Sequence, residues 1–134
     1  MNIISASTTF TTSRLAETRR FYEQYFDAKA VFDCGWYVVL RLSEADSVTE
    51  VCLIEPRDGS TEFAGGATLN LRVADADAVH DRLTKAGLEP LIPIEDHPWG
   101  DRGFGVFGPC GVVVYCYHDI EPADDFKQYH IKSD

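Results

Sequence analysis

The chain has 134 residues, 45% of them hydrophobic and 25% charged, which is typical of a globular domain with one core and excludes a disordered chain. The 22 acidic residues outnumber the 12 Lys and Arg residues, and the resulting net charge of −10 repels phosphate backbones. Nucleic acid is therefore not an expected partner. Excess acid also attracts cationic small molecules, although it equally serves to keep a protein soluble.

Neither a membrane segment nor a targeting segment is expected. No apolar run approaches the roughly 20 residues of a membrane span, and the first residues lack the pattern of a signal peptide. The expected location is the cytoplasm. Four cysteines without metal-binding or redox spacing are predicted to be buried, reduced thiols: Cys34, Cys52, Cys110 and Cys116.

The first half of the chain predicts a strand, a helix and three further strands. The β-branched run at residues 5–12 indicates the first strand, and Ser13 is the expected N-cap of a helix whose apolar residues recur at helical spacing between Leu15 and Phe26. The following strands are expected at residues 30–32, 36–42 and 49–54.

The second half repeats this order at an offset of about 60 residues. Residues 67–73 alternate like a strand, Asp75 is the expected N-cap of a helix that ends at Gly87, and strands are expected at residues 89–94, 103–107 and 111–117. Two βαβββ modules are thus predicted, at residues 1–57 and 63–122, in a single domain spanning residues 1–122. The tail at residues 123–134 has no strong pattern, so it is expected either to fray or to pack on a neighbour through Phe126 and Tyr129.

Alternation in the first strand of the second module predicts the direction of its side chains. Leu69, Leu71 and Val73 share the face that should meet the helix. The polar residues between them share the other face: Thr68, Asn70 and Arg72. Polar groups on that face need partners, so we expect a pocket, a wet groove or a dimer contact there.

Residues 96–117 read DHPWGDRGFGVFGPCGVVVYCY. A Pro-Trp-Gly turn, a strand, a Pro-x-Gly turn and a final apolar strand follow one another in this stretch. It resembles the closing module of the vicinal oxygen chelate superfamily, which includes glyoxalase I, extradiol dioxygenases and bleomycin-resistance proteins. The resemblance extends over residues 4–122. It implies an α+β fold in which two βαβββ modules curl a mixed sheet into a trough, and a homodimer that completes both troughs.

In the metal-dependent members of this superfamily, four trough positions carry His and Glu ligands. Here the resemblance assigns them to Ser7, Leu53, Thr68 and Tyr115, with Leu53 uncertain by one residue. Such side chains do not supply the donors that a transition metal needs. The expectation is no metal and no cofactor. Non-standard metal ligands, for example Glu50, Glu55 or His118, would be needed for a metal-dependent enzyme.

Aromatic side chains are the best candidates for ligand contact, because they offer flat apolar area and attract cations. Trp99 resembles a groove-wall residue, although it could equally be a plug that locks its turn. Arg102 could bind an anionic group or form a surface pair with Asp101. His97 could act as an acid or base, or be a simple loop histidine. Tyr117 and, as a possible lid, Phe63 are further aromatic candidates.

The first hypothesis is a metal-free small-molecule-binding protein of bleomycin-resistance type, which sequesters a drug or another aromatic or cationic ligand in a dimer groove. The predicted ligand-binding residues are Ser7, Trp36, Leu53, Thr68, Asn70, Trp99, Arg102, Phe104 and Tyr115. One alternative is a glyoxalase- or lyase-type enzyme, either metal-dependent or using His97 and Tyr115 for proton transfer. Another is a dimeric interaction module whose trough is filled by its own side chains.

Overall fold

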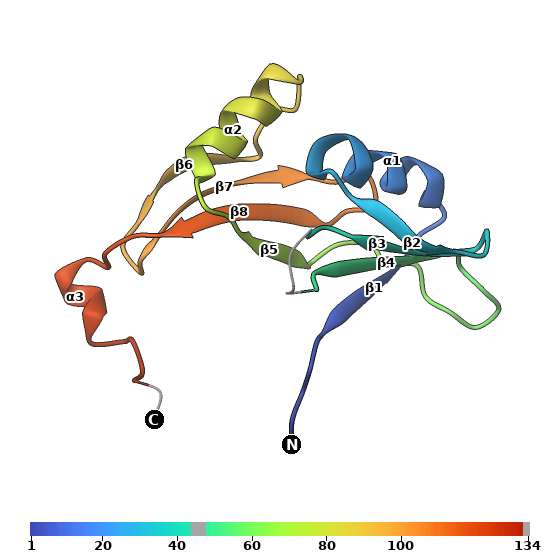
Figure 1. Cartoon of the computed structure of the whole chain (residues 1–134), viewed down its shortest axis with the longest axis horizontal. Helices are drawn as coiled ribbons and strands as arrows, with labels where there is room; N and C mark the ends of the chain where they lie inside the picture. Colours follow the sequence, from blue (N-terminus) through green and yellow to red (C-terminus); the bar gives the residue numbers. More distant parts are fainter. Residues whose placement is uncertain (44–47, 133–134) are drawn as a thin grey trace. The chain divides into compact units, whose positions relative to one another are not determined.

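The helices and strands fall into two units, Met1–Gly66 with Gly108–Gly111, and Ala67–Phe107 with Val112–Asp134. They are seen in a computed structural model that describes residues 1–43 and 48–132. Each unit places one long helix over a four-stranded sheet (Figure 1). This confirms the α+β class and the repeated βαβββ order.

The first unit contains β1 (Ser7–Thr11), α1 (Leu15–Phe26), β2 (Lys29–Asp33), β3 (Tyr37–Arg41) and β4 (Glu50–Ile54). The strand order in its sheet is β1-β4-β3-β2, with β1 parallel to β4 and the other pairs antiparallel. Alternate residues of β3 are buried, as are three consecutive residues of β4 (Val51, Cys52 and Leu53) and Phe21 and Tyr22 of α1. One face of the sheet is therefore core.

The start of α1 differs from the prediction. Arg14, not Ser13, occupies the N-cap, and no side chain caps the first turn. The hydroxyl of Thr12 instead accepts from the N–H of Arg14 at 3.0 Å, and the N–H of Ser13 donates to Oε1 of Glu62. The backbone thus turns one residue later than the spacing indicated. Cys34 is also exposed rather than buried, because it lies in the connection between β2 and β3.

The second unit contains β5 (Thr68–Arg72), α2 (Ala76–Lys85), β6 (Ile92–His97), β7 (Asp101–Phe107), β8 (Val113–Asp119) and the short helix α3 (Asp124–Lys127). Its strand order, β5-β8-β7-β6, repeats that of the first sheet, and β5 is again parallel to the last strand. The predicted alternation in β5 is confirmed, since Leu69 and Leu71 are less exposed than the polar residues between them.

Helix α2 begins as predicted. The side chain of Asp75 accepts from the N–H of Ala78 at 3.2 Å, and the N–H of Ala76 donates to Nδ1 of His118 at 2.8 Å. Two of the backbone donors at the start of this helix are therefore satisfied by side chains.

Strand β6 begins later than predicted, at Ile92, and continues to His97. Its pairing with β7 is irregular between Ile92 and Glu95, so Pro93 lies at a bulge. Proline has no N–H to donate to a regular ladder, which is why it is found at bulges. The tail also has more order than expected, because it contains α3 and a ring contact between Phe126 and Tyr129.

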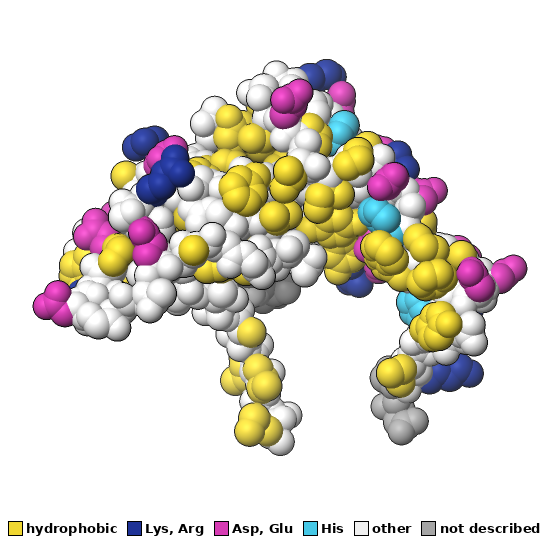
Figure 2. Space-filling view, turned by 180° about the vertical axis from the view of Figure 1, so that it is seen from behind, with side chains coloured by type: hydrophobic (Ala, Val, Ile, Leu, Met, Phe, Trp, Pro, Cys, Tyr) yellow, Lys and Arg dark blue, Asp and Glu magenta, His cyan; other side chains and the backbone are white. Residues whose placement is uncertain are grey.

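Charged side chains form no single patch on the face drawn in Figure 2. Acidic side chains are spread over that face with basic ones among them. Within residues 1–43 and 48–132, no helix combines the length and apolar character needed to cross a bilayer.

Candidate ligand-binding site

The sheet of the second unit has one face under α2 and one open face. Phe104, Val106, Val114 and Cys116 are fully buried on the α2 side. Alternate residues of β7 and β8 point the other way, and these include Tyr115. We call this second side the open face.

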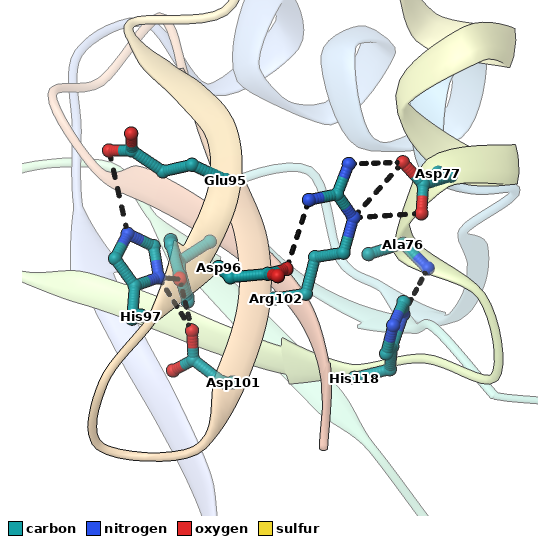
Figure 3. A network of polar contacts seen from close by, with 9 residues as sticks. Ala76, Asp77, Glu95, Asp96, His97, Asp101, Arg102 and His118 are labelled. Carbon is teal, nitrogen blue, oxygen red and sulfur yellow. Dashed lines mark hydrogen bonds and ion pairs between the residues drawn. The ribbon is translucent and has the colours of Figure 1, made fainter. Parts of the chain in front are cut away.

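Asp101 is the centre of a hydrogen-bonded cluster on the open face. The Tyr115 hydroxyl donates to Oδ1 of Asp101 at 2.7 Å, and the indole N–H of Trp99 donates to Oδ2 at 2.7 Å. Nδ1 of His97 lies 2.8 Å from Oδ1 and 3.0 Å from the Tyr115 hydroxyl. Figure 3 shows His97 and Asp101 facing one another across the β6–β7 hairpin. One carboxylate therefore orients three ring side chains.

These contacts shift the pKa values of Asp101 and Tyr115 in opposite directions. Burial by itself raises the pKa of Asp101, but the hydrogen bonds from Tyr115, Trp99 and His97 outweigh it, so the pKa lies below its ordinary value. Burial, followed by the hydrogen bond to Asp101, raises the pKa of the Tyr115 phenol. Asp101 is thus held as a carboxylate and Tyr115 as a neutral donor near pH 7.

Ring stacking completes the cluster. The rings of His97 and Trp99 are parallel, with centroids 4.6 Å apart and an interplanar angle of 2°. Tyr115 and Tyr117 stack at 5.9 Å with an angle of 23°. Flat ring faces held in this way present a pre-organised surface for a planar ligand.

Gly103 makes room for the Tyr115 ring. A Cβ atom at this position would lie 2.7 Å from the Tyr115 hydroxyl and 2.7 Å from the carbonyl oxygen of Cys116. No side chain fits there without moving Tyr115 or the backbone of β8. The glycine thus allows the phenol to lie flat over β7 and reach Asp101.

A hollow of about 380 Å³ lies beside the cluster. Its lining is aromatic and polar, with two carboxylates: Asn70, Trp99, Gly100, Asp101, Tyr115, Tyr117, Asp119 and His130. Ligand pockets in proteins span about 300–1,000 Å³, so this hollow suits a small molecule.

The structure places the predicted site residues in three groups. Asn70, Trp99 and Tyr115 line the hollow. Thr68 is exposed and lies on the same strand as Asn70, two residues earlier.

Ser7 and Trp36 belong to the first unit, where they lie near opposite ends of the sheet. Ser7 pairs with Glu50, whereas Trp36 directly precedes the Tyr37 that pairs with Ile54. These ends are about 13 Å apart along β4. Trp36 is covered by the guanidinium of Arg57, which lies 3.3 Å from the ring centroid.

Three predicted site residues do not lie on an open face. Leu53 and Phe104 have no exposed surface, and Phe104 packs edge-on against His80 of α2. Arg102 also points to the α2 side. It donates to Asp77 at 2.9 Å and to Asp96 at 3.0 Å (Figure 3), so its ion pairs are with these two residues and not with Asp101, which was one of the two alternatives for it. The register of β7 with β8 places Arg102 and Phe104 one residue out of phase with the open face.

The other candidates have structural partners. Phe63 packs edge-on against Phe10, with ring centroids 5.0 Å apart. Glu50 pairs with Arg41, and His118 accepts from the start of α2. Across the described ranges of the chain, no group of three or more His, Cys, Asp or Glu side chains is placed to hold a metal ion.

Sequence reasoning missed Asp101, Asp119 and His130 as parts of this site. Asp101 was considered only as a partner of Arg102, because the turn that brings it to Trp99 and Tyr115 depends on tertiary pairing. Asp119 continues the alternation of Tyr115 and Tyr117 and could have been found from it. His130 carried no local signal.

The comparisons with known proteins agree with this fold. The sequence model of the Glyoxalase/Bleomycin resistance protein/Dioxygenase superfamily matches residues 5–115. No curated protein gives a significant match. The chain is similar in structure to a member of the superfamily from Sphaerobacter thermophilus DSM 20745, with 23% identity over 88% of this chain and 98% of that one and a TM-score of 0.71.

Two further solved structures are similar at the level of the fold. An antibiotic binding protein from Streptomyces sp. CB03234 has 20% identity over 88% of this chain and 97% of that one, with a TM-score of 0.71. A lactoylglutathione lyase from Agrobacterium tumefaciens has 16% identity over 88% and 94%, with a TM-score of 0.71. With a family match across most of its length, the chain belongs to the Glyoxalase/Bleomycin resistance protein/Dioxygenase superfamily.

Proposed function

We propose that this protein binds a small aromatic cation, such as a drug, on the open face of the second sheet and holds it without converting it. The observation that carries the proposal is the hollow whose lining combines Trp99, Tyr115 and Tyr117 with the carboxylate of Asp101. Asp119 also lines the hollow but is paired with Arg72 at 3.2 Å. Aromatic faces and carboxylates together favour planar cations, because both attract positive charge.

The charge of Asp101 supports a cationic ligand. Its three donors are Tyr115, Trp99 and His97, so no Lys or Arg neutralises it within this cluster. The net charge of −10 adds long-range attraction for a cation. The fold is also that of an antibiotic binding protein, which supports a binding role without specifying the ligand.

Binding without conversion fits the acid–base character of the cluster. A tyrosine that abstracts a proton must first become a phenolate, and the raised pKa of Tyr115 opposes this. The resemblance assigns the metal-ligand positions of the superfamily to Ser7, Leu53 (within one residue), Thr68 and Tyr115. This is a poor donor set for a divalent transition metal.

The protein also forms a homodimer in this proposal. Support comes from large apolar side chains left exposed in the first unit, among them Val31, Phe32 and Trp36. Light scattering after size exclusion gives the mass directly. A mass of one chain at all concentrations would contradict the dimer while leaving the ligand site untouched.

The test of the binding site is a thermal-shift and calorimetry panel. It holds proflavine as a planar cation, 1-anthracenesulfonate as a planar anion, and Ni²⁺, Zn²⁺ and Mn²⁺. A ligand at about 100 times its Kd adds about 2.7 kcal/mol of stability, which raises the Tm by several degrees. We expect a shift with proflavine alone. A shift with a metal alone would contradict the proposal and favour a metal-dependent enzyme.

Variants locate the site. Trp99→Ala and Tyr115→Ala should each weaken proflavine binding by about 1–3 kcal/mol. The matched control is Leu91→Ala, an exposed apolar residue of the same unit that does not line the hollow. Equal affinity in all three variants would remove Trp99 and Tyr115 from the site.

A further inference from the structure

One wall of the hollow comes from a segment that lies beyond the repeated modules. Strand β8 ends at Asp119, and the family match ends at residue 115. His130 follows α3, yet it lines the hollow together with Trp99 and Tyr115. The segment that carries it, residues 120–132, is called here the C-terminal strap.

The strap is fastened to the Pro98–Trp99–Gly100 turn by three hydrogen bonds. The N–H of Ile120 donates to the carbonyl of Gly100 at 3.0 Å, and the N–H of Ala123 donates to the carbonyl of Pro98 at 2.9 Å. Nε2 of His130 donates to the carbonyl of Trp99 at 2.7 Å. The backbone carbonyl of each of the three turn residues thus accepts one hydrogen bond from the strap.

The approach of strap and turn is close. A Cβ atom on Gly100 would lie 3.1 Å from Cγ of Pro122 and 3.3 Å from the carbonyl of Ile120, and the φ of Gly100 is +117°. Only glycine adopts this backbone conformation freely. The close packing of the strap against the turn that carries Trp99 therefore requires glycine at position 100.

Beyond Pro122, little apolar burial holds the strap. Tyr129 is 68% exposed and Ile131 is 96% exposed. A segment with few buried contacts opens at low free-energy cost, so the His130 hydrogen bond is a main attachment of its distal half. Substituting His130 should release this part of the wall without unfolding the sheet.

The hollow is a wide depression of about 380 Å³ on the open face, and His130 bounds it on one side. A wall that can be withdrawn on one side leaves the aromatic surface of Trp99, Tyr115 and Tyr117 in place and lengthens the space beside it.

We infer that His130 is a specificity-determining residue, which fastens the C-terminal strap across one side of the hollow and sets the upper size of the planar cation that it accepts. The inference rests on the proposed function, because it concerns the selectivity of the same site.

The experiment compares two cationic probes by calorimetry, N-methylquinolinium with two fused rings and ethidium with three rings and a phenyl substituent. The wild type should prefer the smaller probe after correction for their intrinsic stacking, measured with free tryptophan. His130→Ala should shift the affinity ratio by about tenfold or more toward ethidium. His130→Gln, which retains an N–H donor, should restore most of the original ratio.

The matched control is Ile131→Ala, next to His130 and exposed, which should leave the ratio unchanged. A ratio that changes by less than about twofold in His130→Ala, while both probes bind, overturns the size limit and leaves the proposed function standing. Failure of the wild type to bind either probe overturns the proposed function, and the size limit with it.

A readout without ligand tests the strap itself. In a Trp36→Phe background Trp99 is the remaining tryptophan, since the chain has two. Acrylamide should quench Trp99 more strongly in His130→Ala than in His130→Gln or Ile131→Ala. Equal quenching in all three would mean that His130 does not fasten the strap, whatever the probes do.

Discussion

Asp101 illustrates how one side chain can organise a binding surface. Its two oxygens receive hydrogen bonds from a phenol, an indole and an imidazole, which come from β8, the turn before β7 and the end of β6. Each ring alone would rotate between rotamers, and fixing such a side chain costs conformational entropy. Hydrogen bonds to the shared acceptor offset this entropy cost during folding. The rings are therefore already fixed when a ligand binds.

Replacing Asp101 with Asn should lower the free energy of unfolding at pH 7 by about 1–3 kcal/mol. The NH₂ group of the Asn side chain would face at least one of the groups that now donate to Asp101, and that hydrogen bond would be lost. The folded pKa of Asp101 is below its unfolded value of about 3.9. Its stabilisation is therefore complete above about pH 5 and is lost as the pH falls through the folded pKa.

Urea unfolding at pH 7, 5 and 3 checks this dependence. The difference between wild type and Asp101→Asn should be constant from pH 7 to 5 and shrink at pH 3. Glu89→Gln, at an exposed position of the same unit, serves as the control for a lost carboxylate. A difference that grows on acidification would mean that the folded protein does not favour the charged form.

Two glycines of β7 provide a matched pair. A Cβ on Gly103 meets the carbonyl of Cys116 and the ring of Tyr115 at 2.7 Å, whereas on Gly105 the nearest atom is Cδ1 of Ile92 at 2.9 Å, the end of a flexible side chain. Gly103→Ala should therefore cost about 2–3 kcal/mol of unfolding free energy, and Gly105→Ala about 1 kcal/mol. Denaturation curves that reverse this order would show that β8 yields more easily than Ile92.

At the scale of elements, the two long helices begin differently although their modules repeat. Helix α2 has Asp75 as its N-cap and His118 as a second acceptor, while α1 has Arg14 at its N-cap position and no side-chain cap. Asp75→Ala should thus destabilise the protein by about 1 kcal/mol. Ser13→Ala should change stability by less than about 0.5 kcal/mol. Chemical denaturation of the two variants, with far-ultraviolet circular dichroism as the signal, would contradict this if Ser13→Ala were the more damaging.

The sequence did not determine which residues of β7 face helix α2 and which face the open side of the sheet. The residues from Gly103 to Val106 alternate glycine with large apolar side chains, and Phe107 follows Val106 directly, so the sequence did not decide which face of the strand is buried. The register with β8 and the packing of α2 settle it, because they place Phe104 and Arg102 under the helix. In β6 the bulge at Pro93 shifted the strand beyond the predicted range for a related reason, since only pairing with β7 fixes its position.

At the scale of the whole molecule, hydropathy patterns and the family resemblance were sufficient for the repeated modules and the α+β class. They were insufficient for Asp101 and His130. Asp101 is the first residue of β7 and His130 lies in the tail, and each gains its place through contacts with residues distant in sequence. Sites built from such contacts are the part of a protein that local patterns describe least.

The overall charge gives a prediction for the complete protein. With a net charge of −10, the affinity for proflavine should fall as NaCl rises from about 20 to about 200 mM, by about two- to fivefold, because salt screens the long-range attraction. Titration with the neutral parent ring acridine, above its own protonation range, is the control and should be nearly independent of salt. A proflavine affinity without salt dependence would exclude a role for the acidic surface.

The strand order has a consequence for how the protein folds. In each sheet the strand made last, β4 or β8, lies between an earlier strand and its own hairpin partner. The parallel pairings join residues far apart in the chain, for example Asn70 with Tyr115 and Thr9 with Cys52. They cannot form before the last strand of the module has been synthesised. Such distant pairings slow folding, and during synthesis β1 and β5 remain without neighbours until much of their module has been made. The hairpins β2–β3 and β6–β7 can form earlier, so the kinetic bottleneck in each unit is insertion of its final strand.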